Sequence, residues 1–313
     1  MRVTNNMMNQ STLSSIQYNQ SSLLNMQTQM ASQKKVNVPS DAPSAIASIL
    51  NANGALNKID IYGNNITYLN GEVEVAEGSL SQVSELLQRL KTLTLNAANG
   101  TNSEDQLKSI NDEVKQIKEQ VVALANTNYQ DQYIFSGNKI GTPAYEINDD
   151  GEIIYNGTSQ TGNYKREYEI SDNVFVSVNE AGDRIFGYSE LQNPGPPLVY
   201  TGEGLMNTLN QLTTALDASP ADFDVIRSQI DGLDSALSTV LAVRTELGGV
   251  QTRLTMTNEL HENNKINYST IQSNLQDVDM IQLISDITKQ QTSLQASLSV
   301  GSQIMSLSLL DFM

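Results

Sequence analysis

Both ends of this 313-residue chain carry a helical repeat that is almost free of charge. Within residues 277–313, apolar or small side chains recur at alternating steps of four and three, interrupted at Gln291: Met280, Ile284, Ile287, Leu294, Leu298, Gly301 and Met305. This spacing is typical of a helix that packs along another helix. Because the stretch has few charged pairs to stabilise it in isolation, we expect it to need a partner.

The N-terminal 33 residues repeat this pattern, with Gln20 and Gln27 at intervening positions and Arg2 as their one charged side chain. Residues 1–33 carry a net charge of +1 and residues 280–313 a net charge of −1, so the whole −17 lies between them. We predict that the two ends pair with each other and with neighbouring subunits. The predicted assembly residues are Leu13, Ile16, Leu23, Met30, Ile284, Ile287, Leu294, Leu298 and Met305. The alternatives are closure of a bundle within one chain, or disordered ends.

The segments inside these ends are helical in pattern. Pro39 and Pro43 mark a turn, after which one helix is predicted from Ala45 to about Asn70 and a second from there to a left-handed cap at Asn99-Gly100. Ser103 and Gln106 have the spacing of a capping box. Further apolar repeats predict helices over 107–124, 205–216, 223–247 and, beyond Gly248-Gly249, 250–278. Such sustained repeats predict an elongated helical bundle.

Residues 137–203 differ in composition, being rich in Gly, Tyr, Asn and Pro, with a period of two. The sequence Asp149-Asp150-Gly151 is typical of a hairpin turn. Tyr145 and Ile147 alternate before this turn, and Ile153 and Tyr155 alternate after it. We predict a small antiparallel β domain inserted into a mainly α protein. The expected domains are a terminal coiled-coil domain (1–35 and 277–313), a helical bundle (36–136 and 204–276) and the β insert (137–203).

Several function classes are disfavoured. The excess of acidic groups, 35 against 18 basic ones, argues against binding nucleic acid. With one histidine, His261, and no cysteine, the chain has no usable zinc ligand set. It contains neither a nucleophile elbow nor a phosphate-binding loop, so we expect no enzyme activity and no cofactor. No apolar run is long enough for a membrane span or a cleaved leader, and we expect any export to use neither.

Several motifs in order along the chain resemble the flagellin superfamily of bacteria. They are NMM near the N-terminus, VNVPSDAPSA, AEGSLSQVSELLQRLKTLTLNAANGT, NTNYQDQYIFSG and RTELGGVQTRL. The C-terminal DVDMIQLISDITKQQTSLQASL and LSLLDFM are similar to the hook–filament junction branch of that superfamily. The resemblance covers residues 1–137 and 240–313, and more loosely the insert.

The resemblance implies a structural role outside the cell, as an adaptor layer of the bacterial flagellum. Its implied partners are the first hook-associated protein, flagellin, copies of itself in a ring-like layer, the flagellar export apparatus and an export chaperone. Two other roles remain open: a filament-forming flagellin, or the same scaffold with an adhesive outer β domain. The glutamines that interrupt both repeats leave too little apolar surface to offset the entropy of ordering, so residues 1–33 and 280–313 are predicted to be mobile before assembly. Slow amide hydrogen exchange of these residues in a monomer would contradict this prediction.

Overall fold

The computed structural model describes residues 5–100, 102–148, 153–158, 165–187, 190–193, 199–201, 204–218 and 221–310. The chain forms two compact units. The terminal unit comprises Met1–Ile59 and Glu262–Met313, and the central unit comprises Asp60–His261. Two long helices, α2 (Pro43–Ala97) and α6 (Phe223–Gln276), contribute residues to both units. This mainly helical architecture with a small strand insert confirms the predicted fold class.

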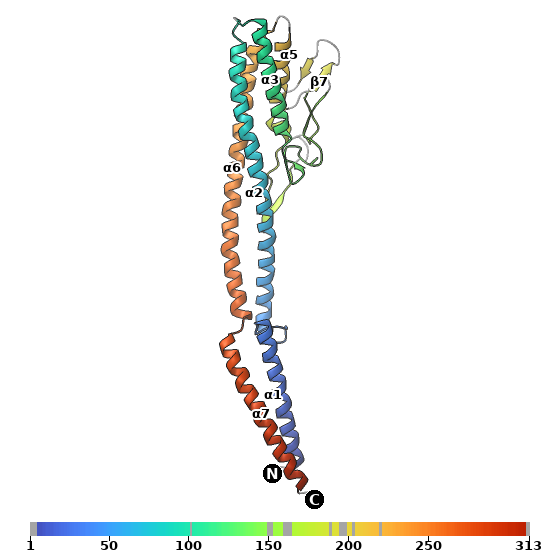
Figure 1. Ribbon diagram of the computed structural model, residues 1–313, viewed down its shortest axis with the longest axis vertical. Coiled ribbons are helices and arrows are strands. Elements are labelled where there is room, and N and C mark those ends of the chain that lie inside the picture. The colour runs from blue at the N-terminus through green and yellow to red at the C-terminus, as the bar shows by residue number, and fades with distance from the viewer. Residues whose placement is uncertain are drawn as a thin grey trace. The chain divides into compact units, whose positions relative to one another are not determined.

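The terminal unit is built on the antiparallel helices α1 (Asn5–Ser32) and α7 (Met280–Leu310), which lie side by side with the two chain termini at one end (Figure 1). Where these helices meet α2 and α6, two short links are tied together through their backbones. The Lys35 amide donates to the Gln276 carbonyl at 2.7 Å, and the Val278 amide donates to the Gln33 carbonyl at 3.1 Å. The chain therefore leaves α1 and enters α7 at the same level.

Side-chain caps define both links. The Asp41 carboxylate accepts the amides of Asn37 and Val38, and these hydrogen bonds lower the pKa of Asp41. Asp279 accepts the amides of Ile281 and Gln282 and so begins α7. Carboxylates thus satisfy backbone donors that no helical carbonyl can reach.

The central unit packs α2 and α6 with α3 (Glu104–Ala125) and α5 (Leu205–Asp217). The predicted capping box at Ser103 and Gln106 is confirmed. Every predicted core position of α3 from Leu107 to Val121 is buried, as are the facing positions on α2 and α6: Leu69, Val73, Leu80, Val83, Leu87, Leu90, Leu233, Val240, Val243 and Leu247. The apolar repeats of the middle segments therefore form one continuous core.

Two predicted helix boundaries were wrong. α2 continues through Asn70 and Gly71, and α6 continues through Gly248 and Gly249. A glycine inside a helix costs only about 1 kcal/mol relative to alanine. The buried side chains on either side of each site, such as Leu69 and Val73, outweigh that cost.

In the described part of the chain, the strands form short antiparallel hairpins and not a single sheet; the first hairpin precedes the predicted insert and the other three lie within it. The pairs are β1 (Asn128–Tyr129) with β2 (Gln132–Tyr133), β3 (Tyr145–Ile147) with β4 (Ile153–Tyr155), β5 (Tyr168–Ser171) with β6 (Val174–Val176), and β7 (Glu190–Asn193) with β8 (Val199–Thr201). A single helical turn, α4 (Gly182–Ile185), lies between β6 and β7. The predicted β3–β4 pairing is confirmed, although its turn lies outside the described residues.

An aromatic cluster joins this insert to the helices. The Phe186 ring meets Phe135 edge-on at 5.3 Å and Tyr145 at 5.9 Å, and all three side chains are buried. The Tyr145 hydroxyl donates to the Gly187 carbonyl at 2.8 Å. Complete burial raises the pKa of Tyr145 well above its ordinary value. These side chains belong to the same hydrophobic cluster as the core of α3 and α5.

Two polar contacts hold the β5–β6 region against α2 and α6. Arg166 forms an ion pair with Glu72 of α2 at 2.6 Å and donates to Gln132 at 2.7 Å. His261 of α6 is buried, stacks on Tyr62 and places its Nε2 atom 2.6 Å from the Ile170 carbonyl. The one histidine of the chain is thus a packed residue that anchors a strand.

Candidate functional site

The candidate site is the pair of terminal helices, and its first feature is the contact between them. Residues at steps of three and four along each helix face the other helix and are at least partly buried. We call these positions the inner seam: Thr12, Ile16, Asn19, Leu23 and Met26 on α1, and Leu283, Ile287, Gln290, Leu294, Ser297 and Gly301 on α7. Leu283, Ile287 and Gly301 are the most deeply buried of the set.

A polar layer lies in the middle of the inner seam. The Asn19 amide nitrogen donates to the Ser297 hydroxyl at 2.9 Å. The Gln290 amide donates to the side-chain and backbone oxygens of Asn19 at 3.1 and 3.2 Å. Hydrogen bonds satisfy these partly buried polar groups, so the layer is tolerated between apolar neighbours.

A close approach of the two helices occurs at Gly301. A Cβ atom at this position would lie 3.3 Å from Ile16 and 3.4 Å from Thr12. The absence of a side chain on Gly301 therefore lets the backbone of α7 approach α1 closely.

Only part of the predicted repeat lies in this seam. Ile16, Leu23, Ile287 and Leu294 face the partner helix as expected. Leu13, Ile284 and Leu298 do not: they are 57%, 52% and 51% exposed. Met30, in the last turn of α1, is also exposed, and the side chain of Met305 lies outside the described part of the chain.

The reason for this difference is a shift of one residue at alternate positions. Where the sequence pattern favoured the apolar residues 13, 284 and 298, the residue before each is the less exposed one: Leu283 is buried, and Thr12 and Ser297 are partly buried. The apolar side chains thus form a second row on each helix. We call it the outer stripe: Leu13, Gln20 and Gln27 on α1, and Ile284, Gln291 and Leu298 on α7.

Geometry places both rows of the outer stripe on one side of the helix pair. Each stripe position follows a seam position by one residue, which is a rotation of about 100° in the same sense in both helices. Because α1 and α7 run in opposite directions (Figure 1), rotations of the same sense bring both rows to the same side. The pair therefore presents one continuous apolar and amide face to a third element.

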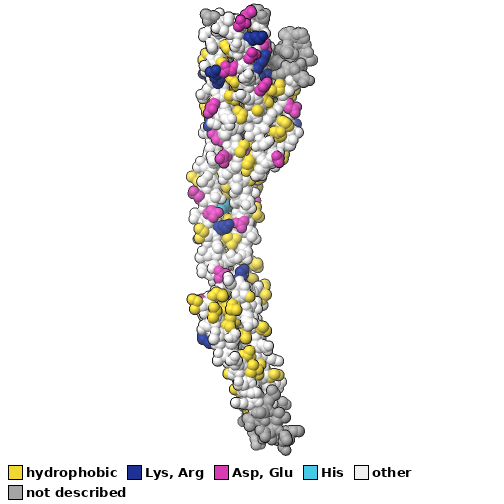
Figure 2. Space-filling model, in the orientation of Figure 1, with side chains coloured by type: hydrophobic (Ala, Val, Ile, Leu, Met, Phe, Trp, Pro, Cys, Tyr) yellow, Lys and Arg dark blue, Asp and Glu magenta, His cyan; other side chains and the backbone are white. Residues whose placement is uncertain are grey.

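The surface of the terminal helices is almost free of charge. On the face shown in Figure 2, uncharged and hydrophobic side chains cover most of the described part of α1 and α7. The ionic groups after Met280 that the structure describes are Asp286 and Lys289, and they form an ion pair with each other at 3.1 Å. Apolar contact and amide hydrogen bonding, and not charge, are thus available for recognition on this surface.

None of the described helices is both long enough and apolar enough to cross a membrane. The same helices match two family descriptions. Residues 3–140 match the bacterial flagellin N-terminal helical region, and residues 230–313 match the bacterial flagellin C-terminal helical region. The chain belongs to the flagellin family.

Within that family the chain is similar to hook-associated proteins along its full length. It is 28% identical to flagellar hook-associated protein 3 of Escherichia coli over 99% of this chain and 98% of the relative. It is 25% identical to the flagellin of Bacillus subtilis over 97% of this chain and 96% of the relative. Among solved structures, a Vibrio parahaemolyticus protein described as a flagellar hook-associated protein superposes with a TM-score of 0.64 at 22% identity, covering 76% of this chain and 100% of its own.

Proposed function

We propose that this protein is a structural component of the bacterial flagellum that forms the adaptor layer between the hook and the filament. Its identity to a third hook-associated protein, 28% against 25% for a filament flagellin over a similar share of the chain, favours this role over that of a filament flagellin. The structural observation that carries the proposal is the outer stripe, a regular row of exposed apolar and glutamine side chains with no partner within the described chain. Such a face is typical of a surface that assembly covers.

In the proposed layer, the outer stripe of one copy packs against terminal helices of neighbouring copies. Burying a leucine or isoleucine side chain contributes about 1.5–3 kcal/mol, and the glutamines of the stripe can exchange amide hydrogen bonds across the contact. The layer would contact the first hook-associated protein on one side and flagellin on the other. We further propose an extracellular location, with export through the flagellar apparatus and a chaperone that covers the terminal helices beforehand.

Seeded assembly observed by negative-stain electron microscopy tests the proposal. Hooks carrying the first hook-associated protein are incubated with this protein and then with flagellin. One short added layer that then permits filament growth is the expected result. Long fibres formed by this protein alone would instead assign it to the filament flagellins, and failure to add to the hook would contradict both roles.

We predict that Ile284→Lys prevents layer formation while leaving the monomer folded. Ile284 is half exposed and lies outside the inner seam, so the change costs the monomer little. In an assembled interface it removes an apolar side chain and buries an unpaired ammonium group, at about 2 kcal/mol or more per contact, or roughly thirtyfold in the association constant. Circular dichroism of the monomer and the seeded assembly measure the two effects, and normal assembly of the variant would contradict the interface.

A matched lysine on another face of α7, away from the inner seam and about 80° around the helix from Ile284, separates assembly from transport. Thr292 is exposed and points away from the inner seam, since it is displaced by about 200° from Gln290 and Leu294. If the terminal helices line the export channel with this uncharged face, Thr292→Lys should permit layer formation but slow filament growth beyond it. Growth at the normal rate would show that this face does not line the channel.

A further inference from the structure

The chain contains four asparagine–glycine pairs: Asn53-Gly54, Asn70-Gly71, Asn99-Gly100 and Asn156-Gly157. At such a pair the glycine amide nitrogen can attack the side-chain carbonyl carbon of the asparagine, because glycine has no side chain to obstruct the approach. The attack needs a glycine amide that is not hydrogen-bonded, an asparagine side chain that can turn, and a backbone free to adjust. All four pairs have the same two residues, so the fold decides which of them can react.

Two of the pairs lie inside α2. A glycine amide within a helix donates to the carbonyl four residues earlier, so the amides of Gly54 and Gly71 are occupied. The Asn53 side chain also accepts a hydrogen bond from the Gln272 amide at 2.7 Å. Cyclisation at Asn53 or Asn70 would therefore require the helix to open locally.

The pair Asn156-Gly157 follows β4 and is restrained by its surroundings. Both residues are partly buried. The Asn156 amide donates to the Ala144 carbonyl at 2.8 Å, and the Asn156 carbonyl accepts a hydrogen bond from the Lys139 ammonium group at 2.9 Å. The Tyr155 hydroxyl occupies the space beside Gly157. The backbone of this pair is thus anchored, although it is not helical.

The pair Asn99-Gly100 lies in the exposed turn between α2 and α3. Apart from its chain neighbours, no atom lies within 4 Å of the position that a Cβ atom on Gly100 would take. Within the described part of the chain, neither the Asn99 side chain nor the Gly100 amide forms a hydrogen bond. Gly100 also lacks the positive φ of the left-handed cap expected there. Of the four pairs, this one meets all three requirements.

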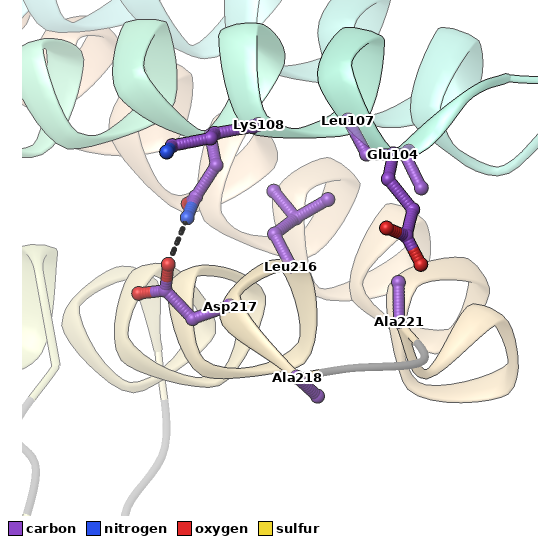
Figure 3. Close-up of a pocket in the computed structure, with 8 residues that line it drawn as sticks. Glu104, Leu107, Lys108, Leu216, Asp217, Ala218 and Ala221 are labelled. Atoms are coloured by element: carbon purple, nitrogen blue, oxygen red, sulfur yellow. Dashed lines mark hydrogen bonds between the residues drawn. The ribbon is translucent and has the colours of Figure 1, made fainter.

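Other asparagines near this turn are held by hydrogen bonds. The Asn102 side-chain amide donates to the Asn96 carbonyl at 2.6 Å. On α3, Asn111 donates to the Asp217 carboxylate in the pocket shown in Figure 3. The unrestrained side chain of Asn99 is therefore not a general property of this end of the central unit.

We propose that Asn99 is a site of spontaneous deamidation. The Gly100 nitrogen forms a bond to Cγ of Asn99, the Cγ–Nδ2 bond breaks, and the amide group leaves as ammonia with the proton from the Gly100 nitrogen. The product is a cyclic succinimide. Water then opens the ring at either carbonyl group and leaves aspartate or isoaspartate at position 99. Water is the one co-reactant.

The modification changes both the charge and the backbone of the turn. Each product adds one negative charge to a chain whose net charge is −17. Isoaspartate also lengthens the main chain by one methylene group. The Asn99 amide donates to the Asn96 carbonyl at 3.2 Å, and the Asn99 carbonyl accepts the Asn102 amide at 3.3 Å, so the longer chain disturbs this turn. We expect it to loosen the capping box that begins α3 at Ser103.

The experiment compares the folded full-length protein with the same protein unfolded in guanidinium chloride, both incubated at neutral pH. After digestion at acidic pH, mass spectrometry measures conversion at each pair, and a protein isoaspartate methyltransferase quantifies the isoaspartyl product. In the unfolded chain all four pairs should convert at similar rates. In the folded protein Asn99 should convert at nearly its unfolded rate, and Asn53 and Asn70 at least about tenfold more slowly, or about 1.4 kcal/mol of local opening.

Two glycine variants make the test specific. Gly100→Ala places a Cβ atom in open space, so it should leave the fold intact and slow conversion of Asn99 about tenfold. The matched control is Gly78→Ala on α2, which also adds a Cβ atom in open space and should leave the rate at Asn99 unchanged. Three results would each overturn the proposal: slowing of Asn99 by folding equal to that of Asn53 and Asn70, faster conversion at another pair, or an unchanged rate in Gly100→Ala.

Discussion

Glu72→Met is expected to lower the free energy of unfolding of the central unit by about 3–5 kcal/mol. The change leaves the Arg166 guanidinium group largely buried, with its Nε atom unpartnered and the Gln132 oxygen as its remaining side-chain acceptor. An uncompensated buried charge is among the most destabilising outcomes of a single substitution. Urea unfolding followed by circular dichroism measures the effect as a lower midpoint at unchanged slope.

The double variant Glu72→Met with Arg166→Met is the control. It should unfold at the same urea concentration as the wild type or at a higher one. The reason is that the free energy lost in desolvating both ions is about equal to the free energy gained from their attraction. Loss of stability equal to that of the single variant would show instead that the ion pair itself is strongly favourable.

The buried Glu72–Arg166 ion pair also makes the free energy of unfolding depend on pH. Burial raises the pKa of the Glu72 carboxyl, with Arg166 acting in the opposite direction. The folded state therefore takes up a proton more readily than the unfolded state, and the contribution of Glu72 to stability falls as the pH rises from about its ordinary value of 4.5 through its folded value. The double variant should lose this component of the pH profile.

Phe186→Ala is expected to destabilise the central unit by about 3–5 kcal/mol. The Phe186 ring is completely buried and meets Phe135 and Tyr145 edge-on, so truncation leaves a cavity at the junction of the insert and the helices. The same urea titration measures the loss. Because the aromatic cluster is continuous with the helical core, one cooperative transition should shift as a whole.

Phe175→Ala is the matched control, since Phe175 lies on β6 of the same insert and is 52% exposed. Its truncation should change the free energy of unfolding by less than about 0.5 kcal/mol. A biphasic transition in Phe186→Ala, with only the insert unfolding early, would contradict the shared core.

The helical fold was predictable because its signal is local and repeated. The heptad of α3, its capping box and the β3–β4 pairing each follow from residues close together in sequence. The continuity of α2 through Gly71 and of α6 through Gly248 and Gly249 was not predictable in this way. It depends on packing against residues far along the chain, which outweighs the intrinsic cost of glycine.

The candidate site was predictable only in part, because two rows of side chains overlap in one repeat. Ile16, Leu23, Ile287 and Leu294 belong to the seam. An apolar pattern cannot show that Thr12, Asn19 and Ser297 are partly buried while Leu13 and Leu298 are exposed. The signal that could have revealed the second row was the pairing of small or polar residues at 12, 19, 290 and 297 with apolar or glutamine residues immediately after them.

The Asn19 layer has a consequence for how the two ends find each other after synthesis. A repeat of similar apolar side chains permits helices to slide by seven residues with little loss of contact. Because Gln290 and Ser297 are seven residues apart, sliding by seven would leave Asn19 beside only one of them, and a partly buried amide would lose a partner. The layer thus selects one alignment among several that are nearly equal in apolar contact, so that each copy presents its outer stripe at the same height.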